Sequence, residues 1–278
     1  MSGTLYVVGT PIGNLGDFSP RAIETLQSVD FIAAEDTRVT LKLLNHFGIK
    51  KPMVSYYEHN IRQRGEMITA RLLQGENCAI VTDAGMPCIS DPGEDLVALC
   101  AAQGIPTVVV PGPSAAISAL AVSGLPTARF SFEGFLTTNK RGRQEHLQSL
   151  VQDPHTLIFY EAPHKLQATL RDMLAVLGDR PISLVRELTK LHEEVFRTTL
   201  AQAVEHYETN TPRGEFVLVV AGANPAETRE ELSFEEAVAL VQALQEKEDI
   251  SASEAAKRIA KETGFKKGEL YKAALAGE

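Results

Sequence analysis

The amino-acid sequence predicts an α/β protein with a mainly parallel sheet, then a mixed sheet, and a small helical domain at the C-terminus. Three observations predict this order. Short β-rich runs alternate with segments of helical spacing, which is typical of βαβ units. The runs are apolar almost throughout, as expected for strands covered on both faces. The last part of the chain, from Ser233 onward, carries helical patterns only.

Five strands and four helices are predicted in the first half. The strands are residues 5–8, 31–34, 53–57, 79–82 and 107–110, and the helices are residues 20–26, 41–47, 61–73 and 94–102. Asp91 followed by Pro92 is typical of a helix entrance, with Asp as the N-cap and Pro in the first turn.

The second half is expected to form a mixed sheet. Its predicted strands are residues 157–160, 182–186, 194–198 and 216–221. The strands containing Val185 and Val195 are separated by a short charged stretch with no room for a crossover helix, so they are predicted to pair antiparallel.

A chain of 278 residues exceeds one average core, so several domains are expected. We predict domain boundaries at 1–113, 114–224 and 225–278, with a polar linker over 223–233. Ser233 with Glu236 three residues later predicts a capping box at the start of the first tail helix. Two further helices are expected within 251–264 and 265–277.

Composition limits the function classes. A net charge of -9 argues against sequence-independent coating of nucleic acid but permits a local basic face. The 3 cysteines fit no zinc spacing and indicate reduced thiols and no metal site. Proline and glycine interrupt the apolar tract 107–126, which argues against a membrane helix. No basic residue precedes the first apolar run, so a signal peptide is not expected and the protein is predicted to be cytoplasmic.

The first candidate ligand turn is "VVGTPIGNLGD", residues 7–17. The spacing of Gly9, Gly13 and Gly16 fits neither a dinucleotide fingerprint nor a P-loop. Pro11 also removes a backbone N–H that a phosphate would use. The turn therefore suits close approach to a ligand that has no phosphate, and a tight turn without any ligand is the alternative.

Two more turns follow predicted strand ends, where ligands bind in open α/β sheets. In residues 81–93, Asp83 offers a carboxylate for ribose hydroxyls or an amine. After Pro-Gly-Pro, Ser114 is predicted to cap a helix whose N–H groups favour a carboxylate, and a plain N-cap is the alternative. Together the turns suggest a ligand with a carboxylate and a ribose, a description that S-adenosylmethionine fits.

Seven stretches carry a family resemblance: "GTLYVVGTPIGNLGD", "AAEDTR", "VTDAGMPCISDPG", "VVPGPSA", "FEGFL", "LIFYEAPHK" and "GEFVLVV". In this order the chain, from residue 3 to its end, resembles the ribosomal small-subunit RNA methyltransferase I family of the tetrapyrrole methylase superfamily. Tetrapyrrole-modifying members generally carry G-D-P where residues 83–87 here read DAGMP. This difference favours the RNA branch.

The resemblance implies two α/β domains of the tetrapyrrole methylase type, usually in a homodimer, with S-adenosylmethionine between the domains. It implies 2′-O-methylation of a cytidine ribose in the decoding region of 16S ribosomal RNA, on the small ribosomal subunit. The implied methyl-donor contacts are Pro11, Gly13, Asp83, Ala84, Gly85, Met86, Ser114 and Ala115, with Tyr160, Glu161 and Leu188 closing the adenosine pocket.

Methyl transfer from an activated donor depends on alignment, and a base or cation would assist a weakly acidic hydroxyl. Asp36, Glu58 and His59 are the candidate bases, and Arg38 and Lys165 are candidates to stabilise the oxyanion. Asp36 as a plain N-cap and His59 as a surface histidine are equally good interpretations, so no single base is chosen.

Two basic segments are predicted to contact RNA: a loop with Lys140, Arg141 and Arg143, and a tail with Lys257, Arg258, Lys261, Lys266 and Lys267. The tail is typical of two short helices across a turn, as in helix-turn-helix units. Solvated helix faces are the alternative for both segments. Two other functions stay open: a small-molecule methylase acting on a tetrapyrrole or a diphthine-type substrate, and a non-catalytic ribosome assembly factor.

Overall fold

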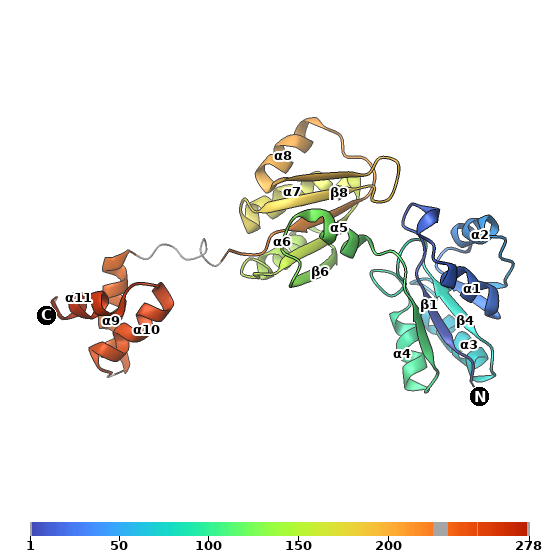
Figure 1. Cartoon of the computed structure of the whole chain (residues 1–278), viewed down its shortest axis with the longest axis horizontal. Helices are drawn as coiled ribbons and strands as arrows, with labels where there is room; N and C mark the ends of the chain where they lie inside the picture. The colour runs from blue at the N-terminus through green and yellow to red at the C-terminus, as the bar shows by residue number, and fades with distance from the viewer. Residues whose placement is uncertain (1, 225–232, 249, 277–278) are drawn as a thin grey trace. The chain divides into compact units, whose positions relative to one another are not determined.

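The computed structural model describes residues 2–224, 233–248 and 250–276 (Figure 1). The chain divides into two compact units, Met1–Gly222 and Ala223–Glu278. Residues 225–232 of the predicted linker lie outside the described residues, and the three predicted domain boundaries stay predictions. None of the helices in the described part of the chain has the length and apolar character that a membrane crossing requires.

The first sheet is parallel throughout, with strand order β3-β2-β4-β1-β5. Its strands are β1 (Leu5–Val8), β2 (Phe31–Ala34), β3 (Met53–Ser55), β4 (Cys78–Val81) and β5 (Thr107–Val110). The helices beside it are α1 (Pro20–Ser28), α2 (Thr37–His46), α3 (Ile61–Leu73) and α4 (Glu94–Ala102), with a short 3-10 turn η1 (Leu15–Asp17). We call residues 5–110 the first lobe.

Both faces of the sheet are buried at its three central strands, β1, β2 and β4. Leu5, Phe31 and Ile80 pack in one apolar cluster, whereas Val8 and Ile32 pack in the other. Successive residues of a strand point to opposite faces, so a strand covered on both sides is apolar at every position. This confirms the parallel sheet that the sequence predicts.

The second sheet is mixed, with strand order β6-β7-β10-β8-β9. Its strands are β6 (Phe130–Phe135), β7 (Thr156–Glu161), β8 (Pro181–Arg186), β9 (Glu194–Thr199) and β10 (Phe216–Val220). The helices of this part are α5 (Ala115–Ser123), α6 (Lys140–Ser149), α7 (Pro163–Leu177) and α8 (Leu200–Thr209). Val185 pairs with Val195 in the antiparallel β8–β9 ladder, as predicted. We call residues 115–220 the second lobe.

Two local predictions are wrong, and one strand was not predicted. Residues 140–143 are not a loop, because α6 begins at Lys140 and the Asn139 side chain accepts a hydrogen bond from the Gly142 N–H. The edge strand β6 was not predicted; its sequence mixes polar and apolar residues, and its register shifts before Gly134. Helix α4 begins at Glu94 after a left-handed Gly93, so Asp91 is not its N-cap.

In the described part of the C-terminal unit, three helices pack together: α9 (Phe234–Glu248), α10 (Ala252–Thr263) and α11 (Lys267–Ala276). Small and branched apolar residues, such as Ala237, Val241 and Ala256, form its core. The predicted capping box is confirmed: the Glu236 N–H donates to Ser233 Oγ at 3.1 Å, and the Ser233 N–H donates to Glu236 Oε2 at 2.8 Å.

Candidate functional site

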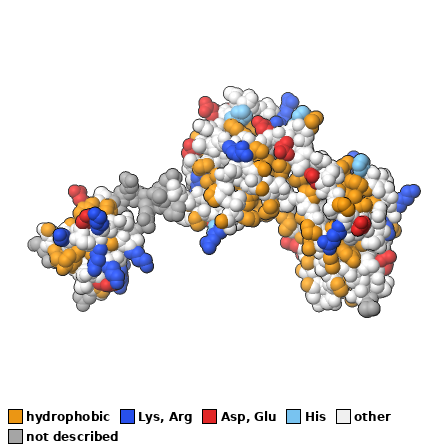
Figure 2. All heavy atoms as spheres, viewed as in Figure 1, with side chains coloured by type: hydrophobic (Ala, Val, Ile, Leu, Met, Phe, Trp, Pro, Cys, Tyr) orange, Lys and Arg blue, Asp and Glu red, His pale blue; other side chains and the backbone are white. Residues whose placement is uncertain are grey.

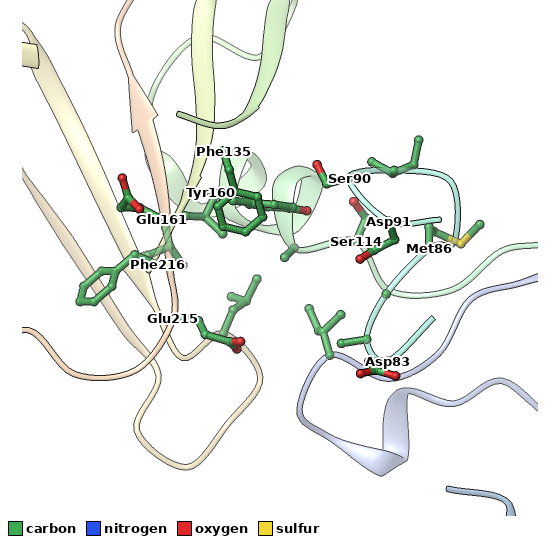
Figure 3. Close-up of a pocket in the computed structure, with 18 of the residues that line it drawn as sticks. Asp83, Met86, Ser90, Asp91, Ser114, Phe135, Tyr160, Glu161, Glu215 and Phe216 are labelled. Atoms are coloured by element: carbon green, nitrogen blue, oxygen red, sulfur yellow. The ribbon is translucent and has the colours of Figure 1, made fainter. Parts of the chain in front are cut away.

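A cavity of about 380 Å³ lies between the carboxyl ends of the first sheet and the second lobe. This volume is within the usual range for a small-molecule site. Figure 3 shows Asp83, Met86, Ser90, Asp91 and Ser114 on one side, and Phe135, Tyr160, Glu161, Glu215 and Phe216 on the other. The cavity therefore takes its two walls from segments far apart in the sequence.

Most of the predicted donor contacts meet in this cavity. Its lining includes Asp83, Ala84, Gly85, Met86, Ser114, Ala115, Tyr160, Glu161 and Leu188. Pro11 and Gly13 are not in the lining, but Ile12 between them is. The shared location agrees with the sequence prediction, and the contact of each residue with a donor stays a prediction.

The three glycine-containing turns that follow β1, β4 and β5 contact one another. A Cβ atom on Gly9 would lie 2.7 Å from the Gly112 Cα atom, so the first and third turns touch through backbone alone. Thr10 and Gly85 exchange backbone hydrogen bonds of 2.8 and 3.2 Å, which joins the first turn to the second. The Gly112 N–H donates to the Met86 sulfur at 3.3 Å. The turns thus form one preorganised wall.

Carboxylates concentrate at one part of this wall. Glu35 Oε2 accepts hydrogen bonds from the Thr82 hydroxyl at 2.5 Å and from the Asp83 N–H at 3.3 Å. Burial raises the pKa of Asp83, and burial together with the nearby Glu35 charge raises the pKa of Asp91 to about 6. An acidic wall of Glu35, Asp83 and Asp91 suits a ligand that brings a positive charge or hydroxyl donors.

The opposite wall is aromatic and apolar around Tyr160. The Tyr160 ring contacts Phe132 and Phe135 edge-on, with centroids 5.0 and 5.4 Å apart. Its hydroxyl accepts a hydrogen bond from the Ala116 N–H at 3.2 Å. Ser114 occupies the N-cap position of α5, but its side chain makes no capping hydrogen bond with the described residues. The Tyr160 hydroxyl therefore accepts the hydrogen bond that was expected to go to the Ser114 side chain.

Glu161 has a structural role at the end of β7. Its buried carboxylate accepts hydrogen bonds from the Thr169 hydroxyl at 2.5 Å and from the Ala162 N–H at 2.8 Å. These bonds fix the turn from β7 into α7. Both carboxylate oxygens therefore have partners within the protein.

None of the five catalytic candidates is among the described residues that line the cavity: Asp36, Arg38, Glu58, His59 and Lys165 all lie outside it. Asp36 caps α2, accepting from the Arg38 N–H at 2.8 Å, and pairs with the Arg38 guanidinium at 2.6 Å. These bonds hold the pKa of Asp36 at about 2, which makes it a poor proton acceptor. The N-cap interpretation of Asp36 is confirmed.

The sequence analysis missed several cavity residues, among them Glu35, Ser90, Glu187, Lys190 and Glu215. Glu35 had the same signal as Asp36, since both follow a buried strand at the carboxyl edge of the sheet. Glu187 and Lys190 lie in the turn between β8 and β9. This turn is a run of charged residues without the glycine spacing that indicated the other ligand turns, so the local sequence did not predict a site there.

The basic segments differ in accessibility. Arg143 is buried and forms an ion pair of 2.6 Å with Asp172, with side-chain exposures of 9% and 10%. Arg143 is therefore not available to RNA, which corrects the prediction from the assumed loop. Lys140 and Arg141 are exposed on α6, although Arg141 pairs with Glu145 at 2.8 Å.

In the C-terminal unit, the basic side chains lie on the surface, and Figure 2 shows lysine and arginine gathered there. Arg258 pairs with Glu248 at 2.7 Å, and Lys266 pairs with Glu269 at 3.3 Å. Lys257 is 4.0 Å from Glu254. Lys261 and Lys267 are exposed as well. These positions permit RNA contact, which stays a prediction.

Comparison with known proteins identifies the family. The profile of the Tetrapyrrole (Corrin/Porphyrin) Methylases matches residues 4–204. The chain is 51% identical over 274 residues, or 98% of each chain, to "Ribosomal RNA small subunit methyltransferase I" of Synechocystis sp.. It is 44% identical to the protein of that name from Escherichia coli O157:H7, covering 98% of this chain and 95% of the relative.

Solved structures agree in fold. A cobalt precorrin-4 methyltransferase superimposes with a TM-score of 0.58 and 18% identity, covering 78% of this chain and 94% of the other. Diphthine synthase superimposes with a TM-score of 0.59 and 14% identity, covering 79% and 90%. At such low identity these likenesses concern the fold alone. The chain belongs to the tetrapyrrole methylase family and, within it, to the group of ribosomal RNA small subunit methyltransferases I.

Proposed function

We propose that the protein transfers a methyl group from S-adenosylmethionine to the 2′-oxygen of a cytidine ribose in the decoding region of 16S ribosomal RNA, acting on the small ribosomal subunit in the cytoplasm. The observation that carries this proposal is that one cavity is lined by most of the predicted donor residues, from Asp83 to Leu188. The substrate class comes from the relatives, which bear the name of a small-subunit ribosomal RNA methyltransferase.

The cavity residues fit S-adenosylmethionine chemically. Glu35, Asp83 and Asp91 suit its ammonium, its sulfonium and its ribose hydroxyls. The N-terminus of α5 at Ala115 suits its carboxylate. Val185, Leu188 and Val217, which pack in one cluster on the cavity side of the second sheet, offer an apolar surface for the adenine. When bound, S-adenosylmethionine supplies an activated methyl group for an in-line displacement.

The chain's main contribution to the reaction is alignment. The three joined turns fix one wall of the cavity, so the acceptor oxygen and the donor can be held in line. Among the carboxyl groups, Asp91, whose pKa is about 6, is better matched to accepting a proton near neutral pH than Asp36, whose pKa is about 2.

Charge and apolar surface support two partners. Exposed Lys140, Arg141, Lys261 and Lys267 supply positive charge for the phosphates of a structured RNA site. A second copy of this chain fits the apolar side chains left exposed on this unit: Val109 is 54% exposed, Ile117 50% and Phe135, which lines the cavity, 55%. We therefore assign small-subunit RNA as the substrate and a homodimer as the assembly.

The decisive experiment uses small subunits from cells that lack this protein. Purified protein and isotope-labelled S-adenosylmethionine should add one methyl group to one cytidine ribose of 16S RNA, detected by mass spectrometry of nuclease digests. Subunits that gain no label, together with no donor binding by calorimetry, would favour a non-catalytic assembly factor. Label on a porphyrinoid or a diphthine-type substrate, with none on subunits, would favour a small-molecule methylase.

The tail is tested separately by ending the chain after Glu230. We expect the shortened protein to bind S-adenosylmethionine as the full chain does, because the cavity lies wholly within Met1–Gly222. Methylation of subunits should fall strongly because the basic helices are lost. Full methylation by the shortened protein would remove the tail from substrate recognition.

A further inference from the structure

The turn between β8 and β9 holds a lysine between two carboxylates. Lys190 Nζ lies 2.8 Å from Glu187 Oε1 and 2.8 Å from Glu215 Oε2. The backbone N–H of Glu215 also donates to Glu187 Oε1 at 3.0 Å, and the N–H of Glu187 donates to the Glu215 carbonyl at 3.0 Å. The ammonium is therefore held in one place by the ends of β8 and β10.

The backbone of this turn is strained. Glu187 has φ of 50° and Thr189 has φ of 65°, and the left-handed region is unfavourable for a β-branched residue. The Thr189 N–H donates to Glu193 Oε2 at 2.6 Å, which supports the turn. Gly214 provides the space opposite, since a Cβ atom there would lie 2.4 Å from Glu187 Cγ. Strain of this kind persists only where the surroundings enforce it, and it concentrates at functional sites.

The same turn contacts the first lobe at Gly13. A Cβ atom on Gly13 would lie 2.5 Å from Lys190 Cγ and 3.0 Å from Thr189 Oγ1. The Thr189 Oγ1 atom is buried and has no hydrogen-bond partner among the described residues. The lysine stem and the threonine thus rest directly on the backbone of the first glycine-containing turn, beside Ile12 in the cavity lining.

We propose that Lys190 is a positioning residue for methyl transfer: its ammonium is fixed by Glu187 and Glu215 in the second lobe, and its stem holds the Gly13 turn of the first lobe in place. This inference rests on the proposed function, because the Pro11–Gly13 turn is a predicted neighbour of the methyl donor. Lys190 touches no reacting atom in this arrangement. It acts by setting the spacing of the two cavity walls.

An ordinary surface ion pair would not have these features. The Lys190 side chain is 30% exposed and lines the cavity, and two carboxylates hold it rather than one. Hydrogen bonds and charges from Glu187 and Glu215 outweigh the effect of burial and raise the pKa of Lys190, so it stays charged at neutral pH. A displacement of about 1 Å at a reacting centre costs about 100-fold in rate, so small movements of the Gly13 turn matter.

The first test compares Lys190→Ala and Lys190→Arg in the full-length protein. We expect Lys190→Ala to lower kcat by about 10- to 100-fold while the KM for subunits changes by less than about threefold, because alignment is lost and RNA contact is not. Lys190→Arg keeps the charge and should recover most of kcat. Arg171→Ala, which removes an exposed ion pair with Glu208 in the same lobe, is the matched control and should leave kcat unchanged.

The second test is a double-mutant cycle with Gly13→Ala. The new methyl group would collide with the Lys190 stem, so Gly13→Ala should reduce kcat more in the wild type than in Lys190→Ala. The backbone cost at Gly13, where φ is 152°, is common to both backgrounds and cancels in the cycle. Effects that simply multiply, with no coupling between the two sites, would overturn the proposal.

A third measurement does not depend on the reaction. Hydrogen exchange of the ligand-free protein should show faster exchange over residues 9–17 in Lys190→Ala than in the wild type, and unchanged exchange there would overturn the proposal. If Lys190→Ala does not fold, Glu215→Gln is the second variant, because it weakens one of the two ion pairs that hold Lys190. Its kcat and its hydrogen exchange should shift in the same directions. If Lys190→Ala exchanges faster over residues 9–17 but the wild type has no methyltransferase activity, the proposed function is refuted. The contact of Lys190 with the Gly13 turn is then still supported.

Discussion

The Tyr160 hydroxyl accepts a hydrogen bond from the Ala116 N–H at 3.2 Å and so joins the end of β7 to the first turn of α5. The first N–H groups of a helix have no partner within the helix, so an acceptor from elsewhere stabilises its start. Here the acceptor lies on a strand 44 residues further along the chain. The helix end expected to receive the donor's carboxylate is thus positioned by the aromatic wall opposite.

Tyr160→Phe should destabilise the protein by about 1 kcal/mol, because one buried N–H loses its acceptor. Donor affinity should fall as well, since α5 is less well placed. Ser114→Ala is the matched comparison and should leave the free energy of unfolding within about 0.5 kcal/mol, because the serine makes no side-chain capping bond. Urea unfolding and calorimetric titration measure the two effects. A larger loss of stability in Ser114→Ala than in Tyr160→Phe would contradict this assignment.

Asp91 predicts a pH dependence with a definite sign. Its pKa is about 6 in the folded protein, above the ordinary value of 3.8, so the folded state holds this proton more tightly than the unfolded chain does. The stability contributed by this group is present below about pH 4 and is lost as the pH rises towards 6. Asp91→Asn should therefore gain stability relative to the wild type between pH 4 and pH 7.

Asp36→Asn provides a control of opposite sign. The pKa of Asp36 is about 2, because Arg38 donates to its carboxylate, so this variant should lose stability relative to the wild type at neutral pH.

Donor binding should also follow the titration of Asp91. Protonation of Asp91 below about pH 6 should weaken the affinity for the donor, which carries a sulfonium, more than the affinity for the product, whose sulfur is an uncharged thioether. Equal pH dependence for both ligands would show that Asp91 does not face the sulfonium, because both ligands carry the ammonium.

Gly9→Ala tests the joined turns. The new Cβ atom would lie 2.7 Å from backbone atoms of Gly112, which cannot rotate away, and 2.6 Å from the Met86 sulfur. We expect a loss of about 3 kcal/mol in the free energy of unfolding, the upper end of ordinary overpacking. Gly268→Ala is the control, since its Cβ atom would meet nothing within 4 Å on helix α11. That control should be neutral or slightly stabilising, and an equal loss in both variants would argue against contact between the turns.

Arg143 and its exposed neighbours should respond differently to substitution. Arg143→Ala leaves the buried Asp172 without its cationic partner, with only the Gln144 amide still donating to it, and should cost about 3 kcal/mol of stability. Lys140→Ala with Arg141→Ala should leave stability nearly unchanged but reduce the slope of log affinity for RNA against log salt by about 1 to 2. Chemical unfolding and binding across a salt series separate the two outcomes. A smaller salt slope in Arg143→Ala would restore that residue as an RNA contact.

Many of the helices and strands of this protein can be predicted from local sequence patterns. The structure has the predicted residues for helices α3 and α4 and for strands β1, β2 and β5. Apolar periodicity predicts such elements because it can be recognised within a few neighbouring residues. The capping box at Ser233 and the antiparallel pair Val185–Val195 were predictable for the same reason. Glycine spacing and strand-end positions also indicated which turns would line the cavity.

Which charged side chains line the cavity depends on tertiary packing and could not be predicted from local sequence. Asp36 and Glu35 are adjacent in sequence, yet one caps a helix and the other lines the cavity. Arg143 is buried and pairs with Asp172, which lies 29 residues further along the chain. The Lys190 side chain contacts Gly13, which belongs to the other lobe. A side chain's charge and reach are local properties, whereas its partner depends on which elements pack against it, and that information is spread over the whole chain.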